Sequence, residues 1–125
     1  MIVVSFNGDQ EHVESIEEFG LALDRYDGVT NFELWLSQIP DGPSICMLRS
    51  GARAFLMYLR FSGDSGFVST GGAAIDGQAE YILSNGQVDE YPLAWCIPVE
   101  QCYKALAYFF VNKGLRSEWV AWHES

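Results

Sequence analysis

The sequence predicts an α+β fold: a single antiparallel β-sheet of about six to seven strands, with an N-terminal and a C-terminal helix packed on it. The expected elements run in the order strand, helix, several strands, helix, strand, which separates the helices from a run of strands. Short turn sequences join the strand candidates, as antiparallel neighbours require. The 125 residues, 49% of them hydrophobic, are expected to form one domain over residues 1–125.

The N-terminal segment predicts a strand followed by a helix. Residues 1–7 are rich in β-branched and apolar side chains, and Asn7-Gly8-Asp9 has turn chemistry. Ser15 and Glu18 match a capping box, which marks the start of a helix. Asp27-Gly28 marks its end. One apolar face at helical spacing consists of Ile16, Phe19, Leu23 and Tyr26.

The middle of the chain predicts an antiparallel meander. Strand patterns separated by turn sequences lie at residues 31–37, 45–49, 55–61, 67–69, 79–83 and 88–91. Asn85-Gly86 is a strong signal for a hairpin between the last two of these strands. Residues 71–77 are glycine-rich and follow neither the helical nor the strand period, so we expect a mobile loop there.

The C-terminal segment predicts a helix with well-marked ends and a closing strand. Pro98 suits the first helical position, and Gly114 suits a left-handed cap after Lys113. Beyond the cap, residues 119–122 favour a strand. The apolar face of this helix includes Cys102, Tyr103, Leu106, Phe109 and Phe110.

The charge of the chain favours a basic partner. Seventeen acids oppose seven bases, which gives a net charge of −10, and no basic patch is present to bind the phosphates of a nucleic acid. Residues 1–24 and 61–103 contain acids but no Lys or Arg. Acids without nearby counter-ions are available to a basic protein, although a purely solubilising surface is the alternative.

The sequence predicts no metal, cofactor or membrane contact. Cys46, Cys96 and Cys102 have the spacing of neither a zinc site nor a redox pair, so we expect buried, reduced thiols. No apolar run reaches the roughly 18 residues of a membrane span. Residues 1–7 lack the pattern of a signal peptide, so a cytoplasmic location is expected.

Two candidate nucleophiles leave a small cytosolic hydrolase open as an alternative. Gly63-Asp64-Ser65-Gly66 resembles the segment around the nucleophile of trypsin-like serine proteases, but turn preferences explain the same residues. Cys96 and His123 are a conceivable thiol–imidazole pair, although nothing in the sequence fixes their distance. A further alternative is a non-catalytic adaptor or oligomerisation module that uses an open sheet edge.

The closing segment resembles the Imm1-type immunity proteins of bacterial polymorphic toxin systems. The resemblance rests on Tyr108-Phe109-Phe110, Gly114-Leu115-Arg116 and Val120-Ala121-Trp122, with Ser117 standing where that family often has proline. It implies a cytosolic antitoxin, not an enzyme, that binds a cognate toxin domain. Such a toxin is commonly a nucleic-acid deaminase or nuclease. The chain itself lacks the zinc-binding signature of deaminases.

We expect the toxin-binding acids to lie on the turns and the glycine-rich loop before the last helix, because binding residues concentrate on loops over a rigid scaffold. An acidic surface there could occlude the basic substrate site of a toxin that acts on DNA or RNA. The expected toxin-binding residues are Asp64, Asp76, Glu80, Asp89 and Glu90. Secondary candidates on the first helix are Glu14, Glu17 and Glu18.

Overall fold

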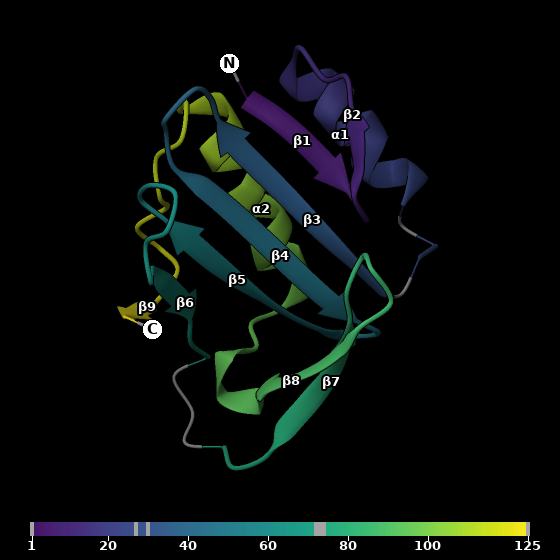
Figure 1. The fold of residues 1–125 in the computed structure, drawn as a ribbon, viewed down its shortest axis with the longest axis vertical. Helices are drawn as coiled ribbons and strands as arrows, with labels where there is room; N and C mark the ends of the chain where they lie inside the picture. The colour runs from purple at the N-terminus through teal and green to yellow at the C-terminus, as the bar shows by residue number, and fades with distance from the viewer. Residues whose placement is uncertain (1, 27, 30, 72–74, 125) are drawn as a thin grey trace.

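The computed structural model describes residues 2–26, 28–29, 31–71 and 75–124, and it confirms the α+β fold (Figure 1). The helices are α1 (Ile16–Arg25), a 3₁₀ turn (Leu93–Trp95) and α2 (Val99–Val111). The strands are β1 (Ile2–Phe6), β2 (Asp9–Glu11), β3 (Asn31–Gln38), β4 (Ser44–Ser50), β5 (Arg53–Leu59), β6 (Phe67–Ser69), β7 (Gln78–Ile82), β8 (Val88–Pro92) and β9 (Trp122–Glu124).

Seven of these strands form one antiparallel sheet in the order β2-β1-β3-β4-β5-β6-β9. Successive side chains point to opposite faces of a strand, so each central strand supplies two separate packing surfaces. On β5, Leu56 belongs to the hydrophobic cluster beneath the helices, whereas Phe55 belongs to a second cluster. Figure 1 shows α2 behind the sheet and the β7–β8 ribbon crossing one end of it in front.

The predicted Asn85-Gly86 hairpin forms, but as its own two-stranded sheet rather than as part of the main one. Strand β6 pairs with β5 on one side and with the closing strand β9 on the other, which leaves no free edge there for β7. The hairpin packs face-on instead, through Ala79 and Tyr81, which are both buried in the second cluster.

The helix ends follow the local signals in the sequence. The Ser15 hydroxyl accepts a hydrogen bond from the Glu18 amide at 3.1 Å, and a Glu18 carboxylate oxygen accepts one from the Glu14 amide at 2.8 Å. The first bond satisfies an amide that the first turn of a helix leaves without a partner, and the second ties the residue before the cap to that turn. Helix α1 ends at Arg25, just before the predicted stop, of which Asp27 lies outside the described residues.

The end of α2 corrects one detail of the predicted cap. Lys113 and Gly114 both have positive φ, 55° and 101°, and the Gly114 amide donates to the Phe109 carbonyl at 2.9 Å. This bond closes a Schellman motif in which Lys113, not the glycine, follows the C-cap residue Asn112. Gly114 is needed for a further reason, since a Cβ atom there would lie 2.8 Å from Pro43. At the other end, Pro98 was expected at the first helical position, but it is the N-cap, the residue just before that position.

The predicted strand at residues 119–122 is wrong over its first part. Strand β9 begins only at Trp122, which pairs with Ser69. Trp119 lies before it, half exposed, with its ring 5.1 Å from that of Tyr108 on α2. A contact with a helix side chain has therefore overridden the β-propensity of Trp119.

Two further expectations concern the loops. Strand β5 ends at Leu59, two residues short of the predicted end, because residues 60–64 form a turn. The predicted mobile loop at residues 71–77 falls partly outside the described residues, since 72–74 are not described. Within the described parts of the chain, no helix is long and apolar enough to cross a membrane.

The packing of α2 predicts the effect of two substitutions on one helix. Phe109 is fully buried against Tyr58, whereas Val111 is exposed. Phe109→Ala should reduce the free energy of unfolding by about 3–5 kcal/mol, because it removes a buried ring and leaves a cavity. Val111→Ala should change it by less than about 0.5 kcal/mol. Urea unfolding followed by circular dichroism measures both, and equal losses would contradict this packing.

Candidate functional site

The outer face of the β7–β8 hairpin brings together two of the predicted acids. Glu80 on β7 and Glu90 on β8 are direct partners in the antiparallel register, and both are exposed. Directly opposite residues share one face of a ribbon, so their carboxylates project from the same side. Like charges in this position destabilise a strand pair. The hairpin thus carries an electrostatic cost that a cation from outside would remove.

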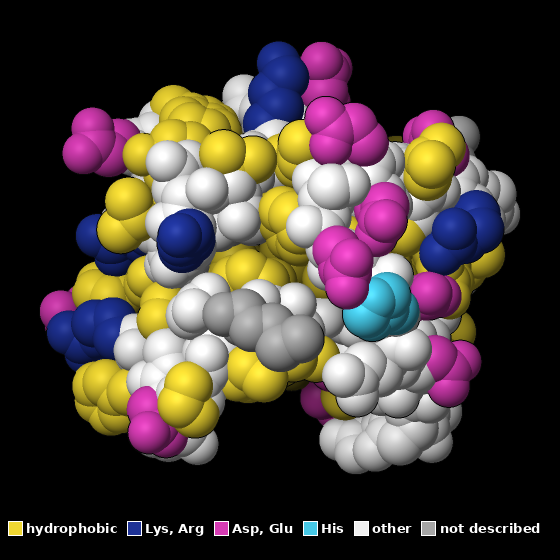
Figure 2. Space-filling model, turned by 90° about the horizontal axis from the view of Figure 1, so that it is seen from above, with side chains coloured by type: hydrophobic (Ala, Val, Ile, Leu, Met, Phe, Trp, Pro, Cys, Tyr) yellow, Lys and Arg dark blue, Asp and Glu magenta, His cyan; other side chains and the backbone are white. Residues whose placement is uncertain are grey.

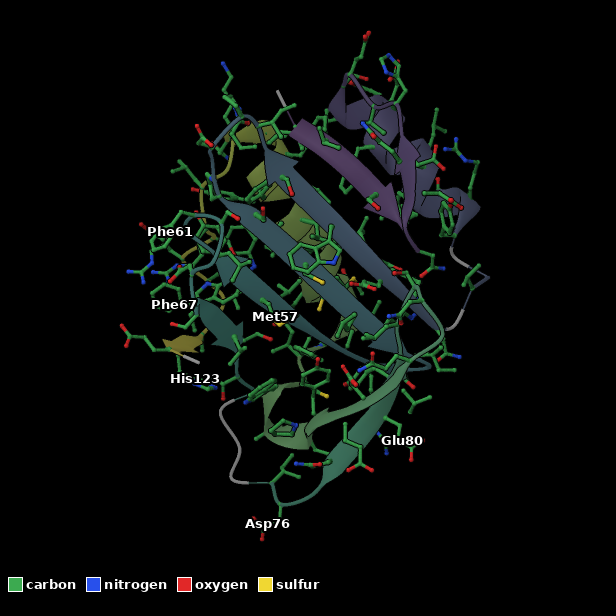
Figure 3. The ribbon with its side chains drawn as sticks, in the orientation of Figure 1. Met57, Phe61, Phe67, Asp76, Glu80 and His123 are labelled. Atoms are coloured by element: carbon green, nitrogen blue, oxygen red, sulfur yellow. The ribbon has the colours of Figure 1, made fainter. Side chains whose placement is uncertain are left out.

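Apolar side chains adjoin these carboxylates. Ile82 and Val88 are the next pair on the same face, and they are 47% and 53% exposed. A surface that combines exposed aliphatic groups with charge is typical of a protein interface. Figure 3 shows Asp76 and Glu80 pointing outward at the hairpin end of the molecule. Asp76, Glu80 and Glu90 form no ion pair with a described Lys, Arg or His.

The inner face of the hairpin holds this surface rigidly. The Phe55 ring on β5 lies 5.1 Å from that of Tyr81, 5.0 Å from that of Tyr91 and 5.5 Å from that of Trp95. Edge-to-face and tilted aromatic pairs of this kind contribute about 0.5–1.5 kcal/mol beyond their buried area. Burial also raises the pKa of the Tyr81 hydroxyl. The aromatic packing on the inner face of the hairpin therefore holds the strands that carry the outward-facing acids in place.

Glu33 ties the tip of the hairpin to the sheet, a role that sequence reasoning missed. Its carboxylate accepts hydrogen bonds from the Ser84 amide at 3.0 Å and from the Trp35 indole at 2.6 Å. Burial would raise the pKa of Glu33, but these bonds outweigh it and hold the pKa below its ordinary value. No local pattern marks this residue, because Ser84 lies 51 positions away.

Asp89 is less available to a partner protein than Glu80 and Glu90 are. It stands opposite Tyr81, on the inner side of the ribbon, and is only partly exposed. Its carboxylate accepts hydrogen bonds from the Gln87 side chain at 2.7 Å and from the Tyr91 hydroxyl at 3.2 Å. Asp89 thus helps to shape the hairpin and offers a partner fewer free lone pairs.

For Asp64, the expectation of an acid without a nearby counter-ion is wrong. Both of its carboxylate oxygens accept from the Arg60 guanidinium at 2.9 Å, and the side chain is only 3% exposed. The hydrogen bonds from the Arg60 side chain hold the pKa of Asp64 far below its ordinary value. Because this carboxylate is already paired within the chain, Asp64 offers a basic partner less free charge than Glu80 or Glu90.

The secondary candidates lie at the start of α1, away from the hairpin (Figure 1). Glu14 accepts from His12 at 2.9 Å, and Glu18 caps the helix, whereas Glu17 is exposed in the first turn. Figure 2 shows several acidic side chains gathered on this end of the molecule. It is a second acidic surface, and two of its three predicted residues have local structural roles.

The two members of the candidate thiol–imidazole pair, Cys96 and His123, contact other groups. The sulfur of Cys96 lies 3.2 Å from the Tyr81 hydroxyl, and the Nδ1 atom of His123 lies 3.0 Å from the Glu124 carbonyl oxygen.

The other two cysteines are protonated. Burial raises the pKa of Cys46 well above its ordinary value and that of Cys102 to about 12, so both are thiols at neutral pH. Among the described residues, no group of three or more His, Cys, Asp or Glu side chains could hold a metal ion.

Comparison with known protein families gives a match over most of the chain. The model of the family described as Immunity protein Imm1 matches residues 7–124, which is nearly the whole chain and includes both acidic surfaces. No curated protein sequence matches the chain.

The Asp64–Arg60 pair predicts a pH-dependent stability difference. The pKa of Asp64 is lower in the folded state than its ordinary value of 3.8. The contribution of Asp64 to the free energy of unfolding is therefore complete above pH 3.8, and it declines as the pH falls toward the folded-state pKa. Asp64→Asn should therefore destabilise the protein more at pH 7 than at pH 3. Urea unfolding at the two pH values measures this difference.

The matched control is Asp76→Asn, which removes an exposed acid without a described ion-pair partner. It should show little effect on stability at either pH. A destabilisation by Asp64→Asn that is the same at pH 7 and pH 3 would contradict the ionic role of this pair.

Proposed function

The chain belongs to the Imm1 immunity protein family, and from that premise we propose that it binds and neutralises a cognate toxin that acts on nucleic acid, a deaminase or a nuclease. The acidic outer face of the β7–β8 hairpin enters the basic substrate site of the toxin and occludes it. The observation that carries this proposal is the Glu80–Glu90 pair, two carboxylates on one exposed face without a described counter-ion.

The two carboxylates match the chemistry of such a site. A protein that binds DNA or RNA places Lys and Arg where the phosphates lie, and a guanidinium binds carboxylate and phosphate with similar fork geometry. One cation between Glu80 and Glu90 would relieve their mutual repulsion and gain two charge-assisted hydrogen bonds. The hairpin pair therefore has more to gain from a basic partner than from water.

Apolar contact would complete the interface. Ile82 and Val88 lie beside the acids and can exclude water from the ion pairs. Exclusion of water strengthens electrostatic interactions, because the effective dielectric constant falls. Asp76 would extend the acidic surface toward the loop before β7. Asp89, partly used within the hairpin, would contribute mainly by holding Tyr91 and Gln87 in place.

The net charge of −10 also favours binding to a toxin with a basic substrate site. An acidic protein approaches a basic groove faster than a neutral one does, because the long-range potential steers the encounter. The secondary residues Glu14, Glu17 and Glu18 would add to this steering field. Inhibition of this kind is binding without chemistry, in keeping with the family, and we place it in the cytoplasm, where an immunity protein would meet a toxin that attacks nucleic acid.

Neutralising the hairpin pair tests the proposal. The partner is the toxin domain encoded by the adjacent reading frame. E80Q/E90Q should weaken binding roughly 10- to 100-fold and reduce its salt dependence, because the paired charges are lost while the side-chain shape is kept. Isothermal titration calorimetry at two or more salt concentrations measures both quantities.

The matched control is D24N/E100Q, which removes the same net charge from two exposed helix positions. It should weaken binding only slightly. If E80Q/E90Q and the control had the same affinity and salt dependence, the hairpin would not be the toxin-binding surface. A large effect of E14Q/E17Q/E18Q instead would assign that role to α1.

A further inference from the structure

A pocket with chemistry opposite to that of the acidic surfaces lies where the segment after α2 meets β5, β6 and β9. Its volume is about 660 Å³, and its floor is aromatic, formed by Tyr58, Phe67 and Trp122. Figure 3 shows Phe67 on the β6–β9 side of the sheet, away from Asp76 and Glu80 at the hairpin. The pocket is therefore separate from the proposed toxin-blocking face.

Arg116 is the central cation of this pocket. Its guanidinium carbon lies 4.3 Å from the centroid of the Phe67 ring and 5.8 Å from the rings of both Tyr58 and Trp122. Cation–π contacts of this kind hold a guanidinium in place but do not satisfy its five N–H donors. Arg116 forms no ion pair with any described carboxylate, although the chain has 17 acids and only seven bases.

The second arginine of the pocket is already neutralised. Arg60 lies 5.1 Å from the Phe67 ring, on which Arg116 also rests, but its charge is balanced by Asp64. Glu118 also lines the pocket. The pocket is thus left with one uncompensated positive charge at most, which suits a monoanion such as a carboxylate and disfavours a dianionic phosphate.

A buried hydroxyl supplies an independent sign of a ligand. Ser117 lines the pocket and is only 1% exposed, yet its Oγ atom has no hydrogen-bond partner among the described residues. The carbonyl group of Ser117 is used, since it accepts from the Trp122 indole at 2.9 Å. A buried hydroxyl without a hydrogen-bond partner destabilises the folded chain, and a ligand that hydrogen-bonds to it removes that cost.

We propose that this pocket receives an acidic side chain, Asp or Glu, of the partner protein. The Arg116 guanidinium binds the carboxylate with two N–H donors. The Ser117 hydroxyl, which is covered in the free chain, rotates toward the carboxylate and donates a third hydrogen bond. This inference rests on the proposed function, because the toxin is the partner that supplies the side chain.

A protein rather than a free metabolite is favoured by the rim of the pocket. Leu115 lines it and is 57% exposed, and Phe61, also exposed, lies beside Arg60, whose guanidinium carbon is 5.8 Å from the Phe61 ring. A central arginine in an aromatic setting, bordered by apolar side chains, is the usual anatomy of an interface hot spot. The positive pocket also complements an acidic residue on a toxin that is basic elsewhere.

The first test uses the chain alone. N-acetyl-glutamate amide carries one side-chain carboxylate, and N-acetyl-glutamine amide is its neutral isostere. Titration of the labelled protein with the first should shift the Arg116 Nε–H and Trp122 Nε1–H resonances saturably, and the second should not. The shift should be lost in Arg116→Gln and kept in Arg53→Gln, which removes an exposed arginine elsewhere.

Three results would overturn the assignment: no saturable shift, a shift that survives Arg116→Gln, or an equal shift with inorganic phosphate, which would mean a general anion site. Binding of N-acetyl-alanine, whose carboxylate is a C-terminus, without binding of N-acetyl-glutamate amide would also overturn it. Arg116→Lys serves if Arg116→Gln does not fold, because it keeps the charge but loses the fork, and it should weaken the carboxylate-dependent shift at Trp122.

The second test uses the complex. Arg116→Gln should weaken toxin binding roughly tenfold or more, while Arg53→Gln should leave it within about twofold. Carboxylate binding in the free chain without any effect of Arg116→Gln on toxin affinity would overturn the assignment of the occupant. Failure of E80Q/E90Q to affect toxin binding, with Arg116→Gln still weakening it, would refute the proposed blocking surface and leave this pocket in place.

Discussion

The two-residue period of β5 is the constraint on which the rest of the structure depends. Leu56 and Tyr58 point toward the helices, and Phe55 points toward the hairpin. Phe55 contacts Tyr81, Tyr91 and Trp95, which carry the acidic ribbon, whereas Tyr58 donates to the Gly114 carbonyl at 2.7 Å and forms part of the Arg116 pocket. A slip of one residue in the register of β5 would exchange these faces and dismantle both surfaces together.

The two surfaces have opposite charge and different construction. The hairpin presents carboxylates from a ribbon with apolar neighbours, and the pocket presents one arginine above aromatic rings. Two complementary contacts of opposite sign orient a partner better than one, because a partner docked in the wrong orientation would meet like charges. The charge pattern thus provides specificity as well as attraction, within a chain whose net charge is strongly negative.

Local signals in the sequence predicted the elements well, and contacts between distant segments account for what they missed. The Ser15–Glu18 cap and the Asn85-Gly86 turn lie within a few residues of the structures they specify, so both are legible. The separation of the hairpin from the main sheet depends on β6 pairing with β9, more than 50 positions along the chain, and no local pattern encodes it. The anchor of the hairpin tip at Glu33 has the same non-local origin.

The same distinction applies to the site. Composition and charge distribution directed attention to the segment that contains Asp76, Glu80 and Glu90, and their exposure agrees with a binding role that stays a prediction. The expectation that Asp64 lacks a counter-ion was wrong because Arg60, just outside the base-free stretch, folds back onto it. The Arg116 pocket was not foreseen, since its aromatic residues come from three strands and its central arginine from the segment after α2.

The central claim is that the chain occupies the substrate site of its toxin. The most direct measurement is the affinity of the chain for the toxin at increasing concentrations of the toxin's nucleic-acid substrate. The account predicts competition: the apparent Kd should rise in proportion to the substrate concentration, and no ternary complex should form. An apparent Kd that does not change at saturating substrate, with a ternary complex present, would show that the acidic surface binds elsewhere and would contradict the account.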